Sequence, residues 1–553
     1  MADSSRFRTT FNRNAIGDLI AQARETPPGD DPVRQILKST GLRYVVKASN
    51  PSLTPQHIEG MIADFWPVRP EVEVLFASIN DLPLPESLQG YFLVSIPGVT
   101  FDELAGQHYD LAYILLAQQA LGFISVEPDL PFLFFASGTG VAPQAVPPGQ
   151  DHGWSLRNIR ADSAWQLPPP TGGLQRGAGI SVAHLDTGWT YHDDLDQGNF
   201  DKKWRIKDFI DKGGNAHDPM DYGGLNNAGH GTRTGSVITS RGGVTDTGTT
   251  PPGVVTGVAG SSVYVPMRCI KSVIVINNSE IAQAIDHARQ TDCDVISMSL
   301  GGRGMKALHD AIQAAVSANL LVVCAAGNNV RKVVWPAAYP ETLAIAATNY
   351  QDAPWAGSCR GREVDVSAPG EQVWHAEPDV RGIATTQGDG TSYATATTAG
   401  VAALWLAFFG KQALLEVADE CHVNLQELFR NALKTTARAP GAWNPKKYGS
   451  GIVDAAALLN RRPTCEDGAM ALEQPVMSEM DELVQQVKSS LATELAVQNP
   501  QDLDMFNHEL ANIVLDELSE NRGDRFFIAA GTIYDIVARR GSATLRSVLG
   551  MYQ

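Results

Sequence analysis

The chain has 553 residues, a length that predicts about three domains. Hydrophobic residues make up 43% and charged residues 19%, as is ordinary for a globular protein. The net charge of −18 argues against nucleic acid or an anionic membrane as the main partner, and no apolar run reaches the ~18 residues that a membrane span needs. Residues 1–37 show one short helical pattern, over 16–23, and form an N-terminal extension.

Residues 38–136 predict a small α+β domain. Apolar residues at helical spacing predict a helix within 101–120. The following segment, 137–150, is rich in Gly, Pro and Ala and is expected to be an exposed linker, because it cannot pack a core. Alternating, β-rich runs predict four strands before the linker, over 42–47, 71–76, 91–96 and 122–129.

Two motifs early in the next region place an acid and a base. An apolar run predicts a buried strand that ends at Asp186, where Thr187 and Gly188 permit a turn. Further along, His230 lies between two glycines at the start of a helical pattern. Each residue has an ordinary alternative, since Asp before Thr-Gly is most often turn chemistry and His flanked by Gly is more often a loop residue.

We interpret Ser392 as a hydroxyl nucleophile. Gly390 supplies a sharp entry to a helix, and the small residues that follow let this helix pack closely. Serine is a weak nucleophile at its free pKa, so a base and an orienting carboxylate must lie elsewhere in the chain. Alone, Ser392 would more often be a helix cap. The order Asp186, His230, Ser392 is that of the subtilisin arrangement, which the ordinary alternatives do not predict.

With these motifs in order, residues 151–458 resemble the catalytic domain of a subtilisin-like serine protease (subtilase, peptidase family S8). The resemblance implies an α/β domain with a central, mostly parallel sheet flanked by helices, and we place this domain at 151–462. It would be preceded by the small α+β domain and followed by a helical region. Four further segments match the family in order, 294–302, 323–328, 366–370 and 448–455.

The resemblance also implies the roles of the site residues. Ser392 attacks the scissile carbonyl, His230 takes and returns its proton, and Asp186 orients the imidazole. Asn328 donates to the oxyanion beside the backbone N–H of Ser392, although an Asn here could merely tolerate a left-handed turn. An extended protein or peptide substrate is expected to bind as a strand along Ser299, Leu300 and Gly301. Ala326 and Gly327, which precede Asn328, are also expected to contact the substrate.

The same resemblance makes residues 38–136 similar to the family's prodomain, which inhibits the protease and helps it to fold. Self-cleavage is then expected within 137–150, and a plain accessory domain is the alternative. Calcium is common in the family. Asp194, Asp208 and Asp218 are loop carboxylates, but no ligand spacing supports a site, so no cofactor is assigned.

Three positions depart from the family pattern. Arg233 stands where a second His is usual, Tyr393 follows the nucleophile where Met is usual, and Thr397 lies near a position where Pro is usual. None of these positions carries a proton in the mechanism. They bear on packing and on the walls of the site, so we predict no preference for the residue before the cleaved bond.

Residues 463–553 predict a small acidic helical bundle. They hold 15 acidic and 6 basic residues, which accounts for half of the net charge of −18. Their apolar stripes are most simply a core, and docking of a partner or of the protease itself is the alternative. Apolar residues at a spacing of 3.6 predict helices within four ranges, 476–495, 503–518, 526–537 and 543–551.

The 6 cysteines show no spacing typical of a metal site or of a disulfide framework. Cys293 and Cys324 are expected to act as small buried hydrophobes. No secretion signal is visible, because the arginines near the start are not followed by an apolar segment. We therefore expect reduced cysteines and a cytoplasmic location, with export without a leader as the alternative.

Three functions fit the sequence. The first is an active endopeptidase held in check by its N-terminal domain. The second is a pseudoprotease that binds extended peptides, which the presence of all four polar catalytic residues disfavours. The third is assembly or regulation through the N- and C-terminal regions, with proteolysis confined to self-processing. An esterase is disfavoured because an edge strand at 299–301 suits an extended peptide.

Overall fold

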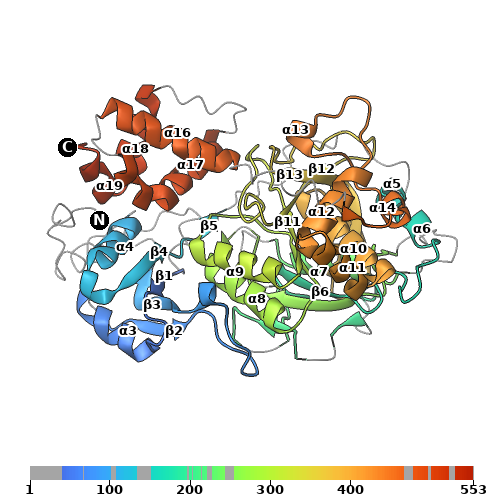
Figure 1. The fold of residues 1–553 in the computed structure, drawn as a ribbon, viewed down its shortest axis with the longest axis horizontal. Coiled ribbons are helices and arrows are strands. Elements are labelled where there is room, and N and C mark those ends of the chain that lie inside the picture. The colour runs from blue at the N-terminus through green and yellow to red at the C-terminus, as the bar shows by residue number, and fades with distance from the viewer. Residues whose placement is uncertain are drawn as a thin grey trace.

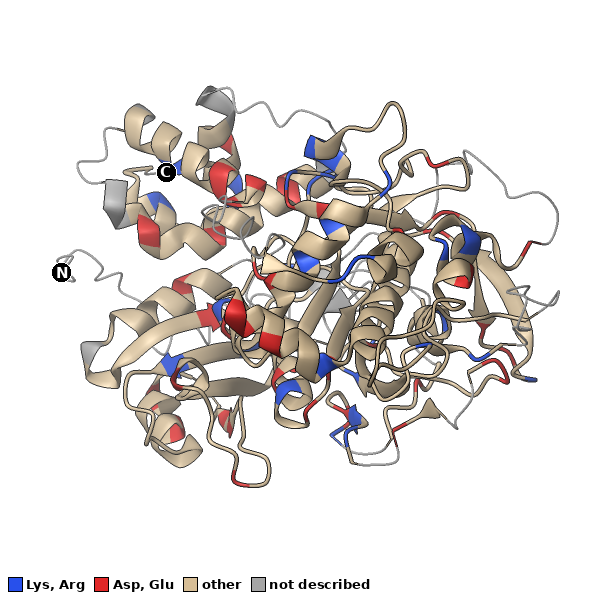
Figure 2. Cartoon of the chain, turned by 45° about the vertical axis from the view of Figure 1, so that its right-hand side comes forward, with Lys and Arg blue, Asp and Glu red and all other residues tan. Residues whose placement is uncertain are grey.

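The computed structural model describes most of the chain (Figure 1). A central α/β region has the N-terminal sheet region and the C-terminal helical region on one side, next to each other (Figure 1, Figure 2). The predictions for 1–37 and 137–150 lie outside the described residues. The described residues are 40–66, 68–100, 107–133, 151–195, 199–201, 204–212, 215–220, 227–242, 254–273, 275–465, 478–495, 500–521 and 530–551.

The N-terminal region contains a four-stranded antiparallel sheet in the order β2-β3-β1-β4. Because side chains alternate along a strand, Tyr44 and Val46 of β1 pack in the region's own core, whereas Val45 joins the core of the central region. The sheet is therefore buried on both faces. The elements are β1 Gly41–Ala48, α3 Pro55–Ile62, η2 Ala63–Phe65, β2 Glu71–Val74, η3 Glu86–Leu88, β3 Tyr91–Thr100, α4 His108–Ala117, η5 Gln119–Leu121, β4 Phe123–Pro128 and β5 Phe132–Leu133.

The predicted α+β character of this region is confirmed, with one helix added and one shortened. Helix α3 was not predicted, although its start carries a local signal. Thr54 caps it and Pro55 occupies its first position. Helix α4 covers the later part of the predicted range 101–120, and 101–106 lie outside the described residues.

The central region is organised around a seven-stranded sheet in the order β13-β12-β11-β10-β6-β8-β7, and its strand pairs are parallel. Most of its strands are buried along their whole length and are rich in apolar residues, as expected of a parallel sheet covered on both faces. The predicted fold class is confirmed. The seven strands of the sheet are β6 Ser181–Asp186, β7 Lys207–Asp208, β8 Val263–Arg268, β10 Val295–Met298, β11 Leu321–Ala325, β12 Leu343–Thr348 and β13 Val364–Pro369. Outside this sheet, β9 Val275–Ile276 pairs with β5, and β14 Val373–Glu377 pairs with β15 Ala384–Gly388.

Helix α10 is the central helix of this region. It is long and apolar enough to cross a membrane by length and composition, but 94% of the relevant window is buried inside the protein. Gly400 packs directly against Val258, as the small-residue run predicts. The helices of the region are α5 Trp154–Asn158, α6 Ala161–Ala164, α7 His230–Thr239, α8 Asn278–Gln290, α9 Lys306–Ser317, α10 Thr391–Phe409, α11 Lys411–Glu420, α12 Leu425–Thr436, α13 Pro445–Tyr448 and α14 Ala455–Asn460.

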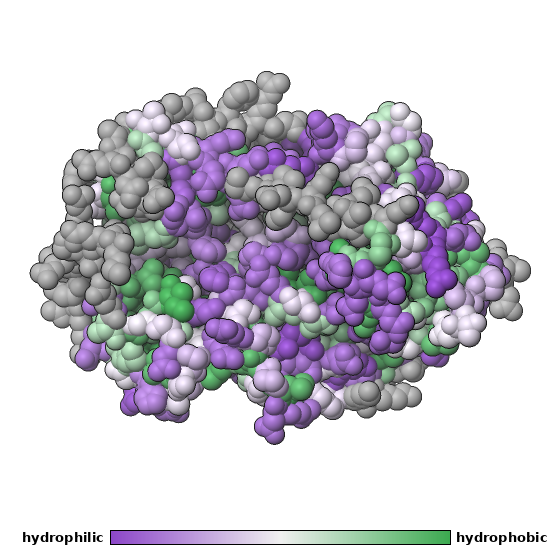
Figure 3. All heavy atoms as spheres, in the orientation of Figure 1, coloured by the Kyte–Doolittle hydropathy of each residue, from purple (hydrophilic) through white to green (hydrophobic). Residues whose placement is uncertain are grey.

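The C-terminal region is helical, as predicted. Its apolar stripes are buried, among them Met480, Val484, Leu510 and Val514. Acidic residues occur along several of its helices (Figure 2), and the face of the molecule drawn in Figure 3 is mainly hydrophilic with small apolar patches. The elements are α16 Glu479–Glu494, η8 Pro500–Phe506, α17 Asn507–Asn521, α18 Ala530–Arg540 and α19 Ala543–Val548.

The expectation that the cysteines stay unpaired is wrong for two of them. Cys421 follows α11 and forms a disulfide with Cys465, 44 residues further along the chain. Spacing alone does not reveal this pair, because the fold of the intervening helices brings the two residues together. Cys293 and Cys324 are free and buried, as predicted, and burial raises the pKa of Cys293 to about 11. The cytoplasmic location stays a prediction.

Candidate active site

Asp186 and His230 form a buried hydrogen-bonded pair at the carboxyl end of β6. The ring Nδ1 of His230 lies 2.9 Å from Oδ1 and 3.0 Å from Oδ2 of Asp186. The backbone N–H of Thr187 also donates to Asp186, at 2.7 Å. Burial alone would raise the pKa of Asp186, but the charge and hydrogen bond of His230 outweigh it and hold this pKa below its usual range. Asp186 is therefore ionised at neutral pH.

The loop before α7 delivers His230 to this position. Gly229 has φ of 77°, a conformation that favours glycine, and its N–H donates to Asp218 at 2.8 Å. Gly231 packs so closely on Gly188 that a Cβ would overlap the carbonyl oxygen of that residue. The glycines on both sides of His230 are thus required by the turn and by the close approach of α7 to the end of β6.

Ser392 lies in the first turn of α10 and is bound to the segment that follows β10. Its hydroxyl donates to the carbonyl of Ser299 at 3.1 Å, and the hydroxyl of Ser299 donates back to the carbonyl of Ser392 at 2.9 Å. β10 lies beside β6 in the sheet, and α7 packs against α10. Because the two strands are parallel neighbours, Ser392 lies at the same end of the sheet as the Asp186–His230 pair.

Asn328 follows β11 and is oriented by the residue before the nucleophile. The backbone N–H and the hydroxyl of Thr391 donate to Asn328 Oδ1, at 3.0 Å and 2.9 Å. Since the amide oxygen accepts both bonds, the amide nitrogen is the group left to donate, and it lies next to Gly390. Thr391 was not among the predicted site residues, although its place in the Gly-Thr-Ser motif was visible.

The five predicted substrate contacts differ in what their backbones do. Ser299, Leu300 and Gly301 continue the chain beyond β10, next to the nucleophile. The carbonyl of Ala326 already accepts from Val334 N–H at 3.1 Å, and that of Gly327 from Cys359 N–H at 2.9 Å. The carbonyls of these two residues are therefore engaged inside the domain. Substrate contact by all five stays a prediction.

A buried histidine beneath the pair was not predicted. His184 lies two residues before Asp186, hence on the same face of β6, and its Nε2 is 3.8 Å from Asp186 Oδ2. Its ring nitrogens bond the hydroxyls of Tyr264, at 2.9 Å, and Thr234, at 3.1 Å. Burial lowers the pKa of His184 to about 4, so its ring is neutral at neutral pH. Thr234 also donates to the carbonyl of His230 at 2.9 Å, which links this network to the start of α7.

Two of the residues that depart from the family pattern, Arg233 and Tyr393, contact the same strand. Arg233 makes two hydrogen bonds of 2.7 Å to the carboxylate of Glu377. Tyr393 stacks on His375 with ring centroids 5.0 Å apart. Glu377 and His375 both belong to β14, so the two substitutions share one supporting strand.

The three loop carboxylates considered for calcium have other partners. Asp208 pairs with Arg268 at 2.7 Å, and Asp194 accepts from the N–H of Val255 at 2.9 Å. Asp218 holds the loop before His230. Within the described part of the chain, no group of three or more His, Cys, Asp or Glu could hold a metal ion.

Comparison with known proteins places this chain in a family. The model of the subtilase family, Peptidase_S8, matches residues 177–454. Subtilisin Savinase of Lederbergia lenta is 30% identical over 306 residues, which cover 55% of this chain and 97% of that protein. An intracellular serine protease of Paenibacillus polymyxa is 30% identical over 54% of this chain and 84% of its own length. M-protease of Shouchella clausii (strain KSM-K16) is 28% identical over 344 residues, which cover 62% of this chain and 77% of that protein. The chain belongs to the subtilase family and is a subtilisin-like serine protease.

Proposed function

We propose that the protein hydrolyses peptide bonds through Asp186, His230 and Ser392, with an acyl-enzyme intermediate. The observation that carries the proposal is the buried Asp186–His230 hydrogen bond on the side of the sheet where Ser392 begins α10. His230 Nε2 accepts the proton of Ser392 as the hydroxyl attacks the scissile carbonyl, and returns it to the leaving amine. Water then releases the acyl group by the same route.

Attack requires the hydroxyl of Ser392 to change its hydrogen-bond partner. It donates to the carbonyl of Ser299 in this structure, and it must donate to His230 to be activated. Catalytic hydrogen bonds often form only when substrate is present. Loss of the bond to Ser299 also frees that carbonyl to accept from the backbone of an extended substrate.

The oxyanion of the tetrahedral intermediate would be bound by Asn328 and by the backbone N–H of Ser392. The hold of Thr391 on Asn328 Oδ1 supports this role, because it fixes the amide with its NH₂ group free to donate. Preorganised donors of this kind stabilise charge that develops only in the transition state.

The N-terminal region is proposed to inhibit the enzyme before self-cleavage. Asp129 accepts from the backbone N–H groups of Asn278 and Ser279 at the start of α8, and Glu127 from that of Lys306 at the start of α9. Just beyond them, β5 pairs antiparallel with β9, a short strand of the central region. This pairing supports inhibition because an added antiparallel strand is also how an extended substrate would bind.

The test compares the purified protein with its Ser392→Ala variant. An active, self-processing enzyme is expected to be cut within 137–150 and to degrade an unstructured protein, and the substitution should abolish both. Ser317→Ala, at an exposed position of α9, is the matched control and should behave like the parent. A cut without turnover of added substrate would favour the regulatory function, and the absence of both would favour the pseudoprotease.

A further inference from the structure

We infer that the C-terminal helical region is a clamp that binds the N-terminal region and holds it on the catalytic domain, so that cleavage of the linker alone does not release it. The clamp is defined as residues 478–551 as described. The binding stands on the contacts below. Its consequence for activity rests on the proposed inhibitory role of the N-terminal region.

The first contact is made by Asp110 of α4, a carboxylate that is only 1% exposed. It accepts from the backbone N–H groups of Ala543, at 3.1 Å, and Thr544, at 2.7 Å, and from the hydroxyl of Thr544 at 2.6 Å. Three donors of the clamp thus converge on one acid of the N-terminal region. Hydrogen bonds to a buried charge are among the stronger ones, so this contact orients the two parts as well as joining them.

The second contact buries an aromatic residue one turn further along α4. Tyr113 packs edge-on against Phe506 with ring centroids 4.9 Å apart, and its hydroxyl donates to Glu509 at 2.9 Å. Glu509 also accepts from the hydroxyl of Ser542 at 3.0 Å. Asp110 and Tyr113 lie on one face of α4, so the clamp covers this helix with matched apolar and polar groups.

The third contact joins all three parts of the molecule. One carboxylate oxygen of Glu127 accepts from the N–H of Lys306 in the catalytic domain, at 2.9 Å. The other accepts from the ring of His508 in the clamp, at 2.8 Å. A single side chain of the N-terminal region is therefore held from both sides. If either partner is removed, Glu127 keeps only its bond to the other partner.

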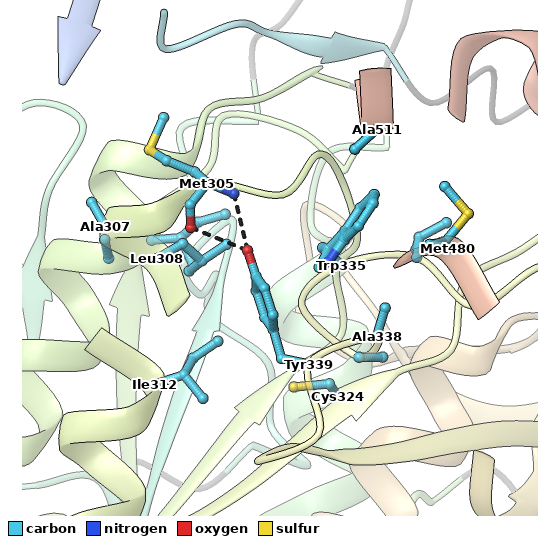
Figure 4. Close-up of a cluster of buried hydrophobic side chains, with 14 of the residues drawn as sticks. Met305, Ala307, Leu308, Ile312, Cys324, Trp335, Ala338, Tyr339, Met480 and Ala511 are labelled. Carbon is cyan, nitrogen blue, oxygen red and sulfur yellow. Dashed lines mark hydrogen bonds between the residues drawn. The ribbon is translucent and has the colours of Figure 1, made fainter. Parts of the chain in front are cut away.

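The clamp is itself anchored on the catalytic domain. Asp516 pairs with Arg303 at 2.8 Å, Glu482 with Arg362 at 2.6 Å, and Glu479 with Lys332. Beside these pairs, Met480 and Ala511 lie near Trp335 in a cluster that continues to Tyr339 and Met305 of the catalytic domain (Figure 4). Because the clamp grips both bodies, the N-terminal region can leave only if α4 separates from it.

The test measures release of the N-terminal region without any need for peptidase activity. In the Ser392→Ala background, a recognition sequence for an added protease replaces residues within 137–150, and the nicked protein carries a fluorophore at its N-terminus. Asp110→Asn is expected to speed dissociation of the labelled fragment at least about tenfold, the equivalent of one lost charged hydrogen bond. Tyr113→Phe should speed it by a smaller factor, because it removes only the hydroxyl that donates to Glu509.

Asp504→Asn is the matched control, since Asp504 pairs with Lys488 inside the clamp. Its fragment should leave at the parent rate. Equal rates for Asp110→Asn, Tyr113→Phe and the parent would overturn the inference, and if Asp110→Asn does not fold, Tyr113→Phe and His508→Gln decide. A failure of the proposed peptidase would show only in the activity comparison and would leave these rates unchanged.

Discussion

The candidate active site and the α8–α9 interface, where the N-terminal region contacts these two helices, both contain buried carboxylates. The partners of these carboxylates come from different regions of the chain. Asp186 is paired with His230, and both belong to the catalytic domain. Glu280 at the start of α8 is paired with Arg43, which belongs to the N-terminal sheet. Burial alone would raise the pKa of Glu280, but Arg43 outweighs it and holds this pKa below its usual range.

The Asp186–His230 pair is therefore complete within the catalytic domain, whereas the charges of the interface are balanced only while both parts are present. When the N-terminal region leaves, Glu280 loses Arg43, and Asp310 on α9 loses Lys47 and the hydroxyl of Tyr91. Catalysis and retention of the N-terminal region should therefore be separable by mutation.

The largest change is expected in catalysis, when the charge of Asp186 is removed and the interface is left intact. Asp186→Asn leaves His230 without a charged partner, so kcat/KM on a peptide should fall by about 10⁴, as in other serine triads. Asp419→Asn, at an exposed position of α11, serves as the control and should keep the parent kcat/KM. Release of the nicked N-terminal fragment should be unchanged in both, and an Asp186→Asn enzyme within tenfold of the parent would remove this residue from the mechanism.

The next largest change is expected in the rate of fragment release, when Arg43 is removed from the interface and the active site is left intact. Arg43→Met leaves Asp129 and Glu280 facing each other without their shared cation, which should speed fragment release by roughly 10²-fold. Arg69→Met is the matched control, because Arg69 is 80% exposed and pairs with Glu59 inside the N-terminal region. The measurement is the dissociation rate in the nicked Ser392→Ala protein. Equal rates for the two variants would show that Arg43 does not hold the interface.

The elements that carry the candidate site residues could be predicted from the sequence because their signals are local and ordered. Asp186 ends a buried strand, His230 and Ser392 begin helices, and Asn328 follows a strand in the expected place. Glycines at the turns and apolar runs in the strands specify these elements without knowledge of their neighbours. The fold class followed for the same reason, since strands and helices alternate along the central region.

What the sequence did not predict depends on contacts between distant segments. The partners of His184 lie 50 and 80 residues away, and Cys421 meets Cys465 only after three helices have packed. The apolar stripes of the C-terminal helices were interpreted as a core, and part of them does form one. That the same helices also cover α4 follows from Asp110, whose burial no local pattern announces.

A smaller loss of activity is expected when His184, the buried histidine beneath the Asp186–His230 pair, is replaced. His184→Leu keeps the volume of the ring but removes both of its hydrogen bonds, and so loosens the link from β6 to the start of α7. We expect kcat to fall about tenfold with little change in KM, the equivalent of one net hydrogen bond. Tyr264→Phe removes only one of the bonds and should have a smaller effect. If His184→Leu lowers the thermal stability but not kcat, the histidine supports the fold and not the base.

The last expected effect concerns the pH dependence of release, to which two titratable groups of the clamp contribute. Burial raises the pKa of Glu509 to about 7, and Glu127 raises that of His508 above its usual range despite the opposing effect of burial. Both groups bind protons more tightly in the closed clamp than when exposed, so their stabilisation is present at low pH and is lost as pH rises through these values. Asp110, Tyr113 and Ser542 face Glu509, and Lys306 and Asp481 act on His508 beside Glu127.

Release of the nicked fragment should therefore be about threefold to tenfold faster at pH 8.5 than at pH 6, measured in the Ser392→Ala protein. Glu509→Gln, which mimics the protonated acid, should flatten much of this dependence, whereas Arg43→Met should raise the rate at every pH. Glu280 has a lowered pKa and stays ionised over this range, whereas burial raises the pKa of Asp129 at the same interface, so Glu509→Gln is the variant that isolates the contribution of the clamp. A rate that falls as pH rises would place the titrating groups outside the clamp.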